Sequence, residues 1–190
     1  MSASWPVQAR AAEAALFDET LACEAVLPAE FAPDAGPGQP LQAEALLRSL
    51  AQVEDLRGED GGEEKRGELP ALAQRLDAKL DLVLALLGRL VRQSTPVLST
   101  RPLRWSVRGL RLAAVDPVDR PPGTAGVVRL QPSDWLPDAL ELPATVAASA
   151  VIDGQPTLWL RFAPLPPALE DALERHLFRM HRREVAARRR

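Results

Sequence analysis

The histidines, the single cysteine and the serine at position 106 are the side chains whose types could support metal binding or nucleophilic catalysis in this chain. His176 and His181 lie five residues apart, about 140° around a helix, so they cannot bind one metal ion from the same helix. We expect both to be solvated. Ser106 has no nearby histidine and lacks the glycine two positions earlier that a nucleophile elbow carries. Cys23 has no partner for an intramolecular disulfide or a cysteine-based metal site. The sequence therefore predicts no catalytic residue, no metal, no cofactor and no enzyme activity.

Charge is divided unevenly along the chain. Residues 1–70 carry five basic and fourteen acidic side chains and residues 71–190 carry eighteen and twelve, which gives net charges of -9 and +6. This division could steer an acidic partner toward the C-terminal part, or let the two parts attract one another between subunits. The acidic residues Asp60, Glu63 and Glu64 lie in a Gly-rich segment without the rigid geometry that catalysis needs, so we interpret them as solubilising charges.

The sequence gives no sign of export or membrane insertion. The N-terminal residues contain no apolar run of signal-peptide length, and the Leu-rich segment at 69–91 is interrupted by Asp81 and Arg89. A lone cysteine suits a reducing compartment. We expect a cytoplasmic protein.

The segment at 69–91 carries the strongest periodic signal, because its apolar residues recur in alternating steps of four and three. This is the a/d spacing of a coiled coil. From Leu80 onward, extra leucines at other heptad positions make the apolar surface wider than one partner helix covers. We predict a homo-oligomer, with a tetramer preferred over a dimer, while a buried helix of a monomer remains the alternative. The predicted interface residues are Leu69, Leu76, Leu80, Val83, Leu84, Leu87 and Leu90.

Further elements flank this helix. A second amphipathic helix is predicted at 41–57, and a charged Gly-rich linker would let the two form an antiparallel hairpin. Residues 1–17 are predicted to be a frayed or weakly helical lead-in. A strand is predicted at 20–27, closed by Pro28.

After residue 91 the pattern changes from helices to short strands. Strands are predicted at 103–115, 127–131, 140–152 and 157–162, with Asp153-Gly154 as a two-residue hairpin turn. Trp135, between strands, is interpreted either as a partner-facing anchor or as a side chain buried under other elements. The chain then ends in an amphipathic helix with the apolar stripe Leu169, Leu173, Leu177 and Met180.

The order of these strands, with three short motifs, resembles the PilZ domain. The matching segments are Ser106-Val107-Arg108-Gly109, Pro122-Gly123-Thr124 and Leu160-Arg161-Phe162. The resemblance covers roughly residues 97–185 and implies an α+β fold: a small antiparallel six-stranded β-barrel with an inserted pair of long helices and a C-terminal helix. On this interpretation residues 1–40 supply the first strand, 41–95 the oligomerisation helices, and 96–190 the rest of the barrel with the last helix.

The resemblance also implies a candidate ligand site. PilZ domains typically bind cyclic di-GMP through an Arg-x-x-x-Arg segment ahead of the barrel and an (Asp/Asn)-x-Ser-x-x-Gly strand. Here Arg104 replaces the acidic residue, and no Arg-x-x-x-Arg precedes the first strand. The degenerate site would comprise Arg104, Ser106, Arg108 and Gly109, with Gly109 expected to serve a backbone turn and Ser106 a local hydrogen bond. We predict that cyclic di-GMP is not bound.

These inferences combine into a non-enzymatic, PilZ-like regulatory or adaptor protein that oligomerises through its heptad-repeat helices. Resemblance to PilZ proteins implies links to bacterial motility, type IV pili or virulence, and a signalling or pilus-related protein as partner. Two alternatives stay open: a cyclic di-GMP receptor that uses unusual arginines such as Arg104 and Arg108, and a β-barrel nucleic-acid binder that uses the arginine-rich C-terminal helix.

Overall fold

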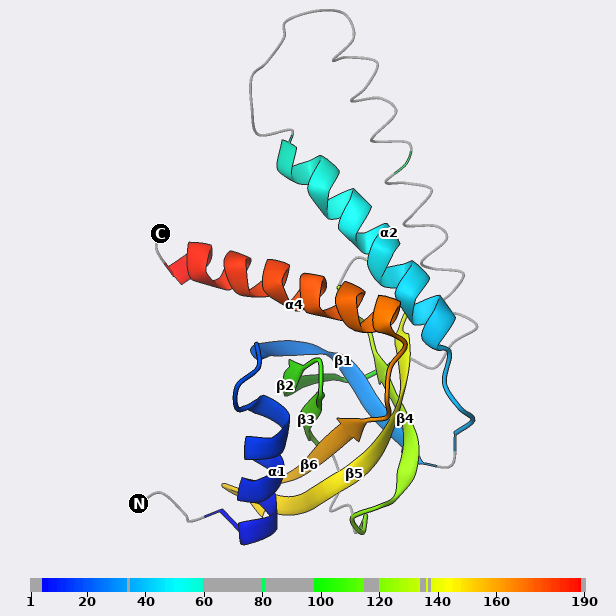
Figure 1. Cartoon of the computed structure of the whole chain (residues 1–190). Coiled ribbons are helices and arrows are strands. Elements are labelled where there is room, and N and C mark those ends of the chain that lie inside the picture. Colours follow the sequence, from blue (N-terminus) through cyan, green and yellow to red (C-terminus); the bar gives the residue numbers. More distant parts are fainter. Residues whose placement is uncertain are drawn as a thin grey trace, which may run out of the picture.

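Six antiparallel strands form a closed barrel in the computed structural model of the chain, which describes residues 5–33, 35–59, 80, 98–114, 120–133, 136 and 138–188 (Figure 1). The strands are β1 (Cys23–Pro33), β2 (Thr100–Ser106), β3 (Gly109–Ala113), β4 (Ala125–Leu130), β5 (Leu140–Ile152) and β6 (Gln155–Phe162). They follow the order β1-β2-β3-β6-β5-β4 around the barrel. Closure leaves no unpaired sheet edge in the barrel. The predicted six-stranded barrel is confirmed.

The hairpin between β5 and β6 forms at the predicted turn. Asp153 and Gly154 have φ angles of 51° and 82°, and positive φ at both central positions is what a type I′ turn requires. On β6, Leu158, Leu160 and Phe162 belong to the core of the barrel, as their alternation predicts.

Strand β1 extends beyond the predicted end at Pro28. Residues 23–28 pair with β2 and residues 29–33 pair with β4, so Pro28 stands where the strand changes partner. The Pro28 carbonyl still accepts a hydrogen bond from the Gln131 amide, at 3.0 Å. Proline removes one donor from a ladder, and the loss is tolerated at a break in the pairing. Because the prediction ended the strand at Pro28, it missed five further strand residues, 29–33.

The single strand predicted at 103–115 is in fact the hairpin of β2 and β3. Val107 and Arg108 form its two-residue turn, and Ser106 pairs with Gly109 across it. The Arg108 amide donates to the Ser106 hydroxyl at 3.1 Å, which confirms the expected local hydrogen bond of that serine. Neither turn residue is a glycine, asparagine or aspartate, so the usual turn signal is missing.

In the described part of the chain, the helices α1 (Val7–Phe17), α2 (Pro40–Glu59) and α4 (Pro167–Arg188) flank the barrel. Helix α2 follows β1 and precedes β2 in sequence, as the predicted insertion requires. Helix α4 lies over one end of the barrel, and helix α2 crosses α4 (Figure 1). The predicted stripe on α4 is confirmed, because its leucines join the same core as Leu47 of α2 and the barrel interior.

The predicted interface helix at 69–91 lies outside the described residues except for Leu80, whose exposed fraction is 58%. The interface residues Leu69, Leu76, Val83, Leu84, Leu87 and Leu90 therefore stay predictions, as does the role of Trp135. In the described part of the chain, no helix is long and apolar enough to cross a membrane.

Candidate functional site

Helix α1 covers the outer face of the barrel that carries the predicted ligand motif. Of the two forms predicted for residues 1–17, frayed or weakly helical, the structure shows a helix over residues 7–17, and one side of this helix is buried. Ala9, Ala12 and Leu16 lie along that side and pack with Trp159 of β6 and Ala148 of β5. Their spacing of three and four residues is a helical stripe, but small alanine side chains make it a weak signal.

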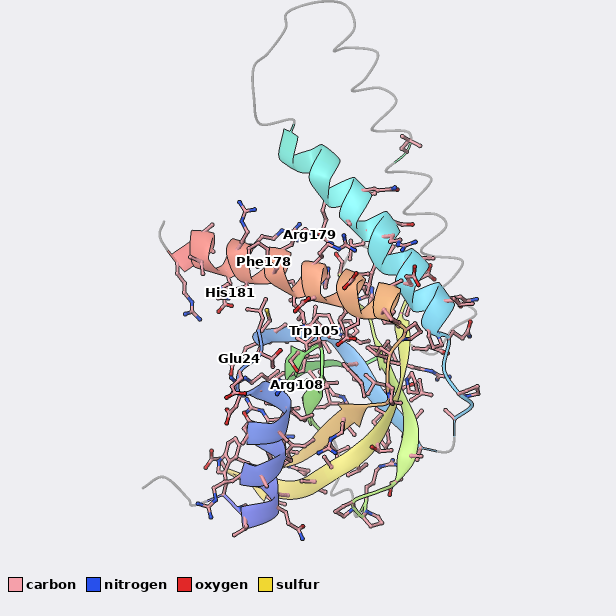
Figure 2. All side chains as sticks on the ribbon, viewed as in Figure 1. Glu24, Trp105, Arg108, Phe178, Arg179 and His181 are labelled. Atoms are coloured by element: carbon pink, nitrogen blue, oxygen red, sulfur yellow. The ribbon has the colours of Figure 1, made fainter. Side chains whose placement is uncertain are left out.

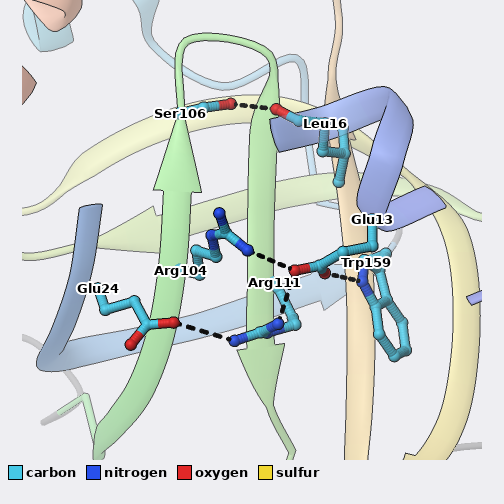
Figure 3. Close-up of polar contacts among 7 residues, drawn as sticks. All are labelled: Glu13, Leu16, Glu24, Arg104, Ser106, Arg111 and Trp159. Carbon is cyan, nitrogen blue, oxygen red and sulfur yellow. Dashed lines mark hydrogen bonds and ion pairs between the residues drawn. The ribbon is translucent and has the colours of Figure 1, made fainter. Parts of the chain in front are cut away.

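Glu13 of α1 is the centre of a partly buried polar cluster on this face (Figure 3). Its Oε1 accepts hydrogen bonds from Arg104 Nη1 at 2.8 Å and from Arg111 Nη1 at 2.7 Å. Its Oε2 accepts a hydrogen bond from Trp159 Nε1 at 2.7 Å. Only 17% of the Glu13 side chain is exposed, so these charge-assisted bonds form in a partly dehydrated environment. One carboxylate thus holds α1 against β2, β3 and β6.

The pairing of β2 with β3 explains why two arginines reach the same carboxylate. Arg104 and Arg111 are direct partners in the register, so their side chains leave the sheet next to each other. Arg104 also lies over the Phe17 ring, at 4.8 Å from its centre, and Arg111 over the Trp5 ring, at 5.6 Å. The basic residue at the motif's acidic position is therefore complementary to this chain's own N-terminal helix.

The remaining motif residues also contact α1 or the residue that follows it. The Ser106 hydroxyl donates to the Leu16 carbonyl at 2.7 Å, and Ser106 itself is fully buried. Arg108 Nη1 donates to the Asp18 carbonyl at 3.0 Å. Both bonds satisfy carbonyls at the C-terminal end of α1, where a helix leaves such groups unpaired.

Gly109 allows α1 to lie close to the sheet, rather than forming the expected backbone turn. Its φ angle is not in the left-handed region. A Cβ added at Gly109 would lie 2.2 Å from the Leu160 carbonyl oxygen and 2.7 Å from Leu16 Cδ2. The absence of a side chain is what lets α1 lie this close to the sheet. The structure thus brings Arg104, Ser106, Arg108 and Gly109 together beneath one helix.

A second polar cluster, centred on the nearly buried Glu54 side chain, joins α2 to α4. Both carboxylate oxygens of Glu54 accept hydrogen bonds, one from Arg179 Nε and one from Arg183 Nη1, each at 2.9 Å. The Glu54 side chain is 7% exposed. Two of the arginines on which the nucleic-acid alternative depends are therefore already bound to α2.

His176 lies next to this cluster, and the expectation that it is solvated was wrong. It is 1% exposed, and its ring lies edge-on to Trp105 with the ring centres 5.6 Å apart. Among the residues that the structure describes, neither ring nitrogen has a hydrogen-bond partner. Burial lowers the pKa of His176 from 6.5 to about 4. Its place on the apolar side of α4, one residue before Leu177, was the signal that sequence reasoning missed.

The Cys23 thiol is buried against α4 and donates to the Leu177 carbonyl at 3.3 Å. Burial is the main cause that raises the pKa of the Cys23 thiol, and the negative charge of the nearby Glu184 carboxylate raises it further. The thiol therefore stays protonated and is a poor nucleophile. Within the described ranges, no group of three histidine, cysteine or acidic side chains is arranged to hold a metal ion.

Comparison with known proteins identifies relatives of this architecture. Residues 47–190 match the family model described as atypical PilZ domain, cyclic di-GMP receptor. The chain is also similar to a pathogenic protein from Xanthomonas campestris, whose crystal structure is that of a tetrameric PilZ domain self-assembled via an unusual helical bundle. That similarity has 60% identity, covers 96% of this chain and 99% of that chain, and has a TM-score of 0.79.

Two solved structures show weaker likeness. The inhibitor of motility MotI from Bacillus subtilis shares 14% identity over 44% of this chain and 42% of that chain, with a TM-score of 0.38. The PilZ domain of YcgR from Escherichia coli, solved with cyclic di-GMP, shares 24% identity over 47% and 80% of the two chains, with a TM-score of 0.36. No curated protein matches the chain.

Proposed function

Because the chain belongs to the atypical PilZ domain family, we propose that it is a non-enzymatic regulatory or adaptor protein. We further propose that it works as a homotetramer and that it does not bind cyclic di-GMP. The observation that carries the non-binding part is the engagement of Arg104, Ser106 and Arg108 by α1 and the residue after it. A cyclic dinucleotide carries two phosphates, and it would have to compete with the Glu13 carboxylate for Arg104 and Arg111.

Isothermal titration with cyclic di-GMP tests this part of the proposal. The full-length protein should give no binding heat, while the PilZ domain of YcgR serves as the positive control. Micromolar binding would contradict the proposal. It would favour the second candidate function, a cyclic di-GMP receptor with a divergent motif. This candidate is supported by the matched family, which is a family of cyclic di-GMP receptors.

The tetrameric state is supported by the heptad spacing at 69–91 and by the 60% identical relative, which is a tetramer formed through a helical bundle. Light scattering after gel filtration should give the mass of four chains of 20.6 kDa each. Replacing Leu80 and Leu87 together by aspartate should reduce the mass, because unpaired charges in a dry seam are costly.

Val151→Asp is the matched control for that double variant, because Val151 is an exposed apolar residue at the end of β5. The Val151→Asp variant should have the same assembly mass as the wild-type protein. A monomeric wild-type protein would contradict the tetramer, and an unchanged mass in the double variant would place the interface elsewhere.

The division into 1–40, 41–95 and 96–190 assigns assembly to the inserted helices and recognition to the barrels. We infer that the protein acts in bacterial motility, type IV pili or virulence through a signalling or pilus-related partner in the cytoplasm. Affinity capture from cells that express the tagged full-length protein tests this. Recovery of partners from unrelated processes only would contradict the inference.

A further inference from the structure

A groove of about 450 Å³ lies on the barrel where the end of α1, the β2–β3 turn and the segment between β6 and α4 come together. Its lining includes Leu16, Val107, Arg108, Arg161, Leu165 and Glu170. Figure 2 shows Arg108 at this end of α1. The groove therefore begins where the cover provided by α1 ends.

Among the described residues that line it, the groove has two arginines and one carboxylate, so its net charge is positive. Arg161 and Arg108 are exposed, and neither has a carboxylate within ion-pair distance in the described part of the chain. Arg108 uses one guanidinium nitrogen on the Asp18 carbonyl, which is an uncharged acceptor. Arg104 and Arg111, on the same outer face, differ because both are paired with Glu13. Two guanidinium groups thus remain to bind an external anion.

The strand register keeps Arg161 accessible. On the β3 side its partner is Gly109, which has no side chain, and on the β5 side its partner is the small Thr145. Trp159, two residues earlier on the same face of β6, is covered by α1. Arg161 therefore continues this face just beyond the end of the helix.

The rest of the lining is largely apolar. Leu16 and Phe162 are buried at the base of the groove, and Val107 and Leu165 are half-buried side chains packed against the barrel core. Glu170, in the first turn of α4, adds one carboxylate. A ligand that fits this lining has carboxylates for the arginines and apolar side chains for the base.

We propose that this groove is the docking site for an acidic, amphipathic peptide segment of a partner protein. The proposal rests on the adaptor function proposed above and deepens it by placing the partner's contact surface. Partner carboxylates pair with Arg108 and Arg161, while partner apolar side chains cover Val107 and Leu165.

A labelled eight-residue peptide of alternating leucine and glutamate is the probe, and the matching leucine–lysine peptide is its control. Fluorescence anisotropy with the full-length protein should show saturable binding of the acidic peptide only. Arg161→Glu and Arg108→Glu should each raise its Kd at least about tenfold, as expected for loss of a charged pair at an interface. Arg175→Glu makes the same charge change at an exposed arginine of α4 outside the groove and should change the Kd less than about twofold.

The proposal is overturned if the acidic peptide does not bind, if both peptides bind equally, or if the groove variants bind like the wild-type protein. Thermal unfolding of each variant checks that these exposed substitutions leave the fold intact. Absence of binding by both the acidic peptide and cyclic di-GMP would overturn this inference alone. Cyclic di-GMP binding that needs Arg108 and Arg161, without peptide binding, would overturn the proposed function as well.

Discussion

Replacing His176 by phenylalanine should make the stability of the protein less sensitive to acid. His176 is almost fully buried and has no hydrogen-bond partner among the described residues. Burial is the main reason that its pKa falls to about 4. The groups that face it act in opposite directions: Glu54 raises the pKa, whereas Arg179 and Arg183 lower it further. The folded protein therefore resists protonation of this imidazole.

The size of the effect follows from the difference between the folded and unfolded states. The unfolded chain binds a proton at this histidine near pH 6.5, and the folded chain does so only near pH 4. At about 1.4 kcal/mol per pKa unit, this difference corresponds to about 3 kcal/mol of unfolding free energy. That stability is present above pH 6.5 and is lost as the pH falls from 6.5 to 4.

Urea denaturation at equal protein concentration, repeated between pH 7.5 and 4, measures this loss. Relative to the wild-type protein, His176→Phe should gain about 3 kcal/mol across that range. At pH 7.5 it should be at least as stable, since no unpaired ring nitrogens remain buried. His181→Phe on the same helix retains His176 and should keep the wild-type pH dependence. Parallel curves for the wild-type protein and His176→Phe would refute this reasoning.

Three further substitutions, each measured by urea denaturation at neutral pH, test the contact of α1 with the barrel and the contact of α2 with α4. Glu13→Gln should lower the unfolding free energy by about 1–3 kcal/mol, because Arg104 and Arg111 lose their shared carboxylate. The control Glu24→Gln should change the unfolding free energy little, because the Glu24 side chain is 72% exposed. Gly109→Ala should lower the unfolding free energy by more than about 2 kcal/mol, since the new Cβ overlaps backbone. Gly36→Ala should be nearly neutral, because a Cβ there meets no described atom within 4 Å. Glu54→Gln should cost on the order of 1–3 kcal/mol by weakening the α2–α4 contact, and an unchanged midpoint would show that this ion pair contributes nothing.

The barrel could be predicted from the sequence because its signals are local. The alternation in β6 and the Asp153-Gly154 turn depend on residues next to one another, and both were confirmed. The boundary between β2 and β3 was missed because its turn is stabilised by the Ser106 hydroxyl rather than by a special turn residue. The continuation of β1 was missed because the change of pairing partner at Pro28 is a property of the closed barrel.

The arrangement of the candidate site could not be predicted, because its contacts join residues far apart in sequence. Glu13 lies more than ninety positions from Arg104, and no periodicity connects the two. The sequence shows that Arg104 stands at the motif's acidic position, but it does not show that Glu13 is the partner of Arg104. Burial of His176 depends likewise on how α4 lies over the barrel, which the helical pattern alone does not fix.

The central claim is that α1 occupies the motif face of the barrel and that cyclic di-GMP does not displace it. Amide hydrogen exchange of the full-length protein, with and without saturating cyclic di-GMP, tests this most directly. We predict that residues 11–17 of α1 exchange slowly and that the nucleotide leaves their rates unchanged. Fast exchange in α1 without the nucleotide, or faster exchange when it is added, would contradict the claim.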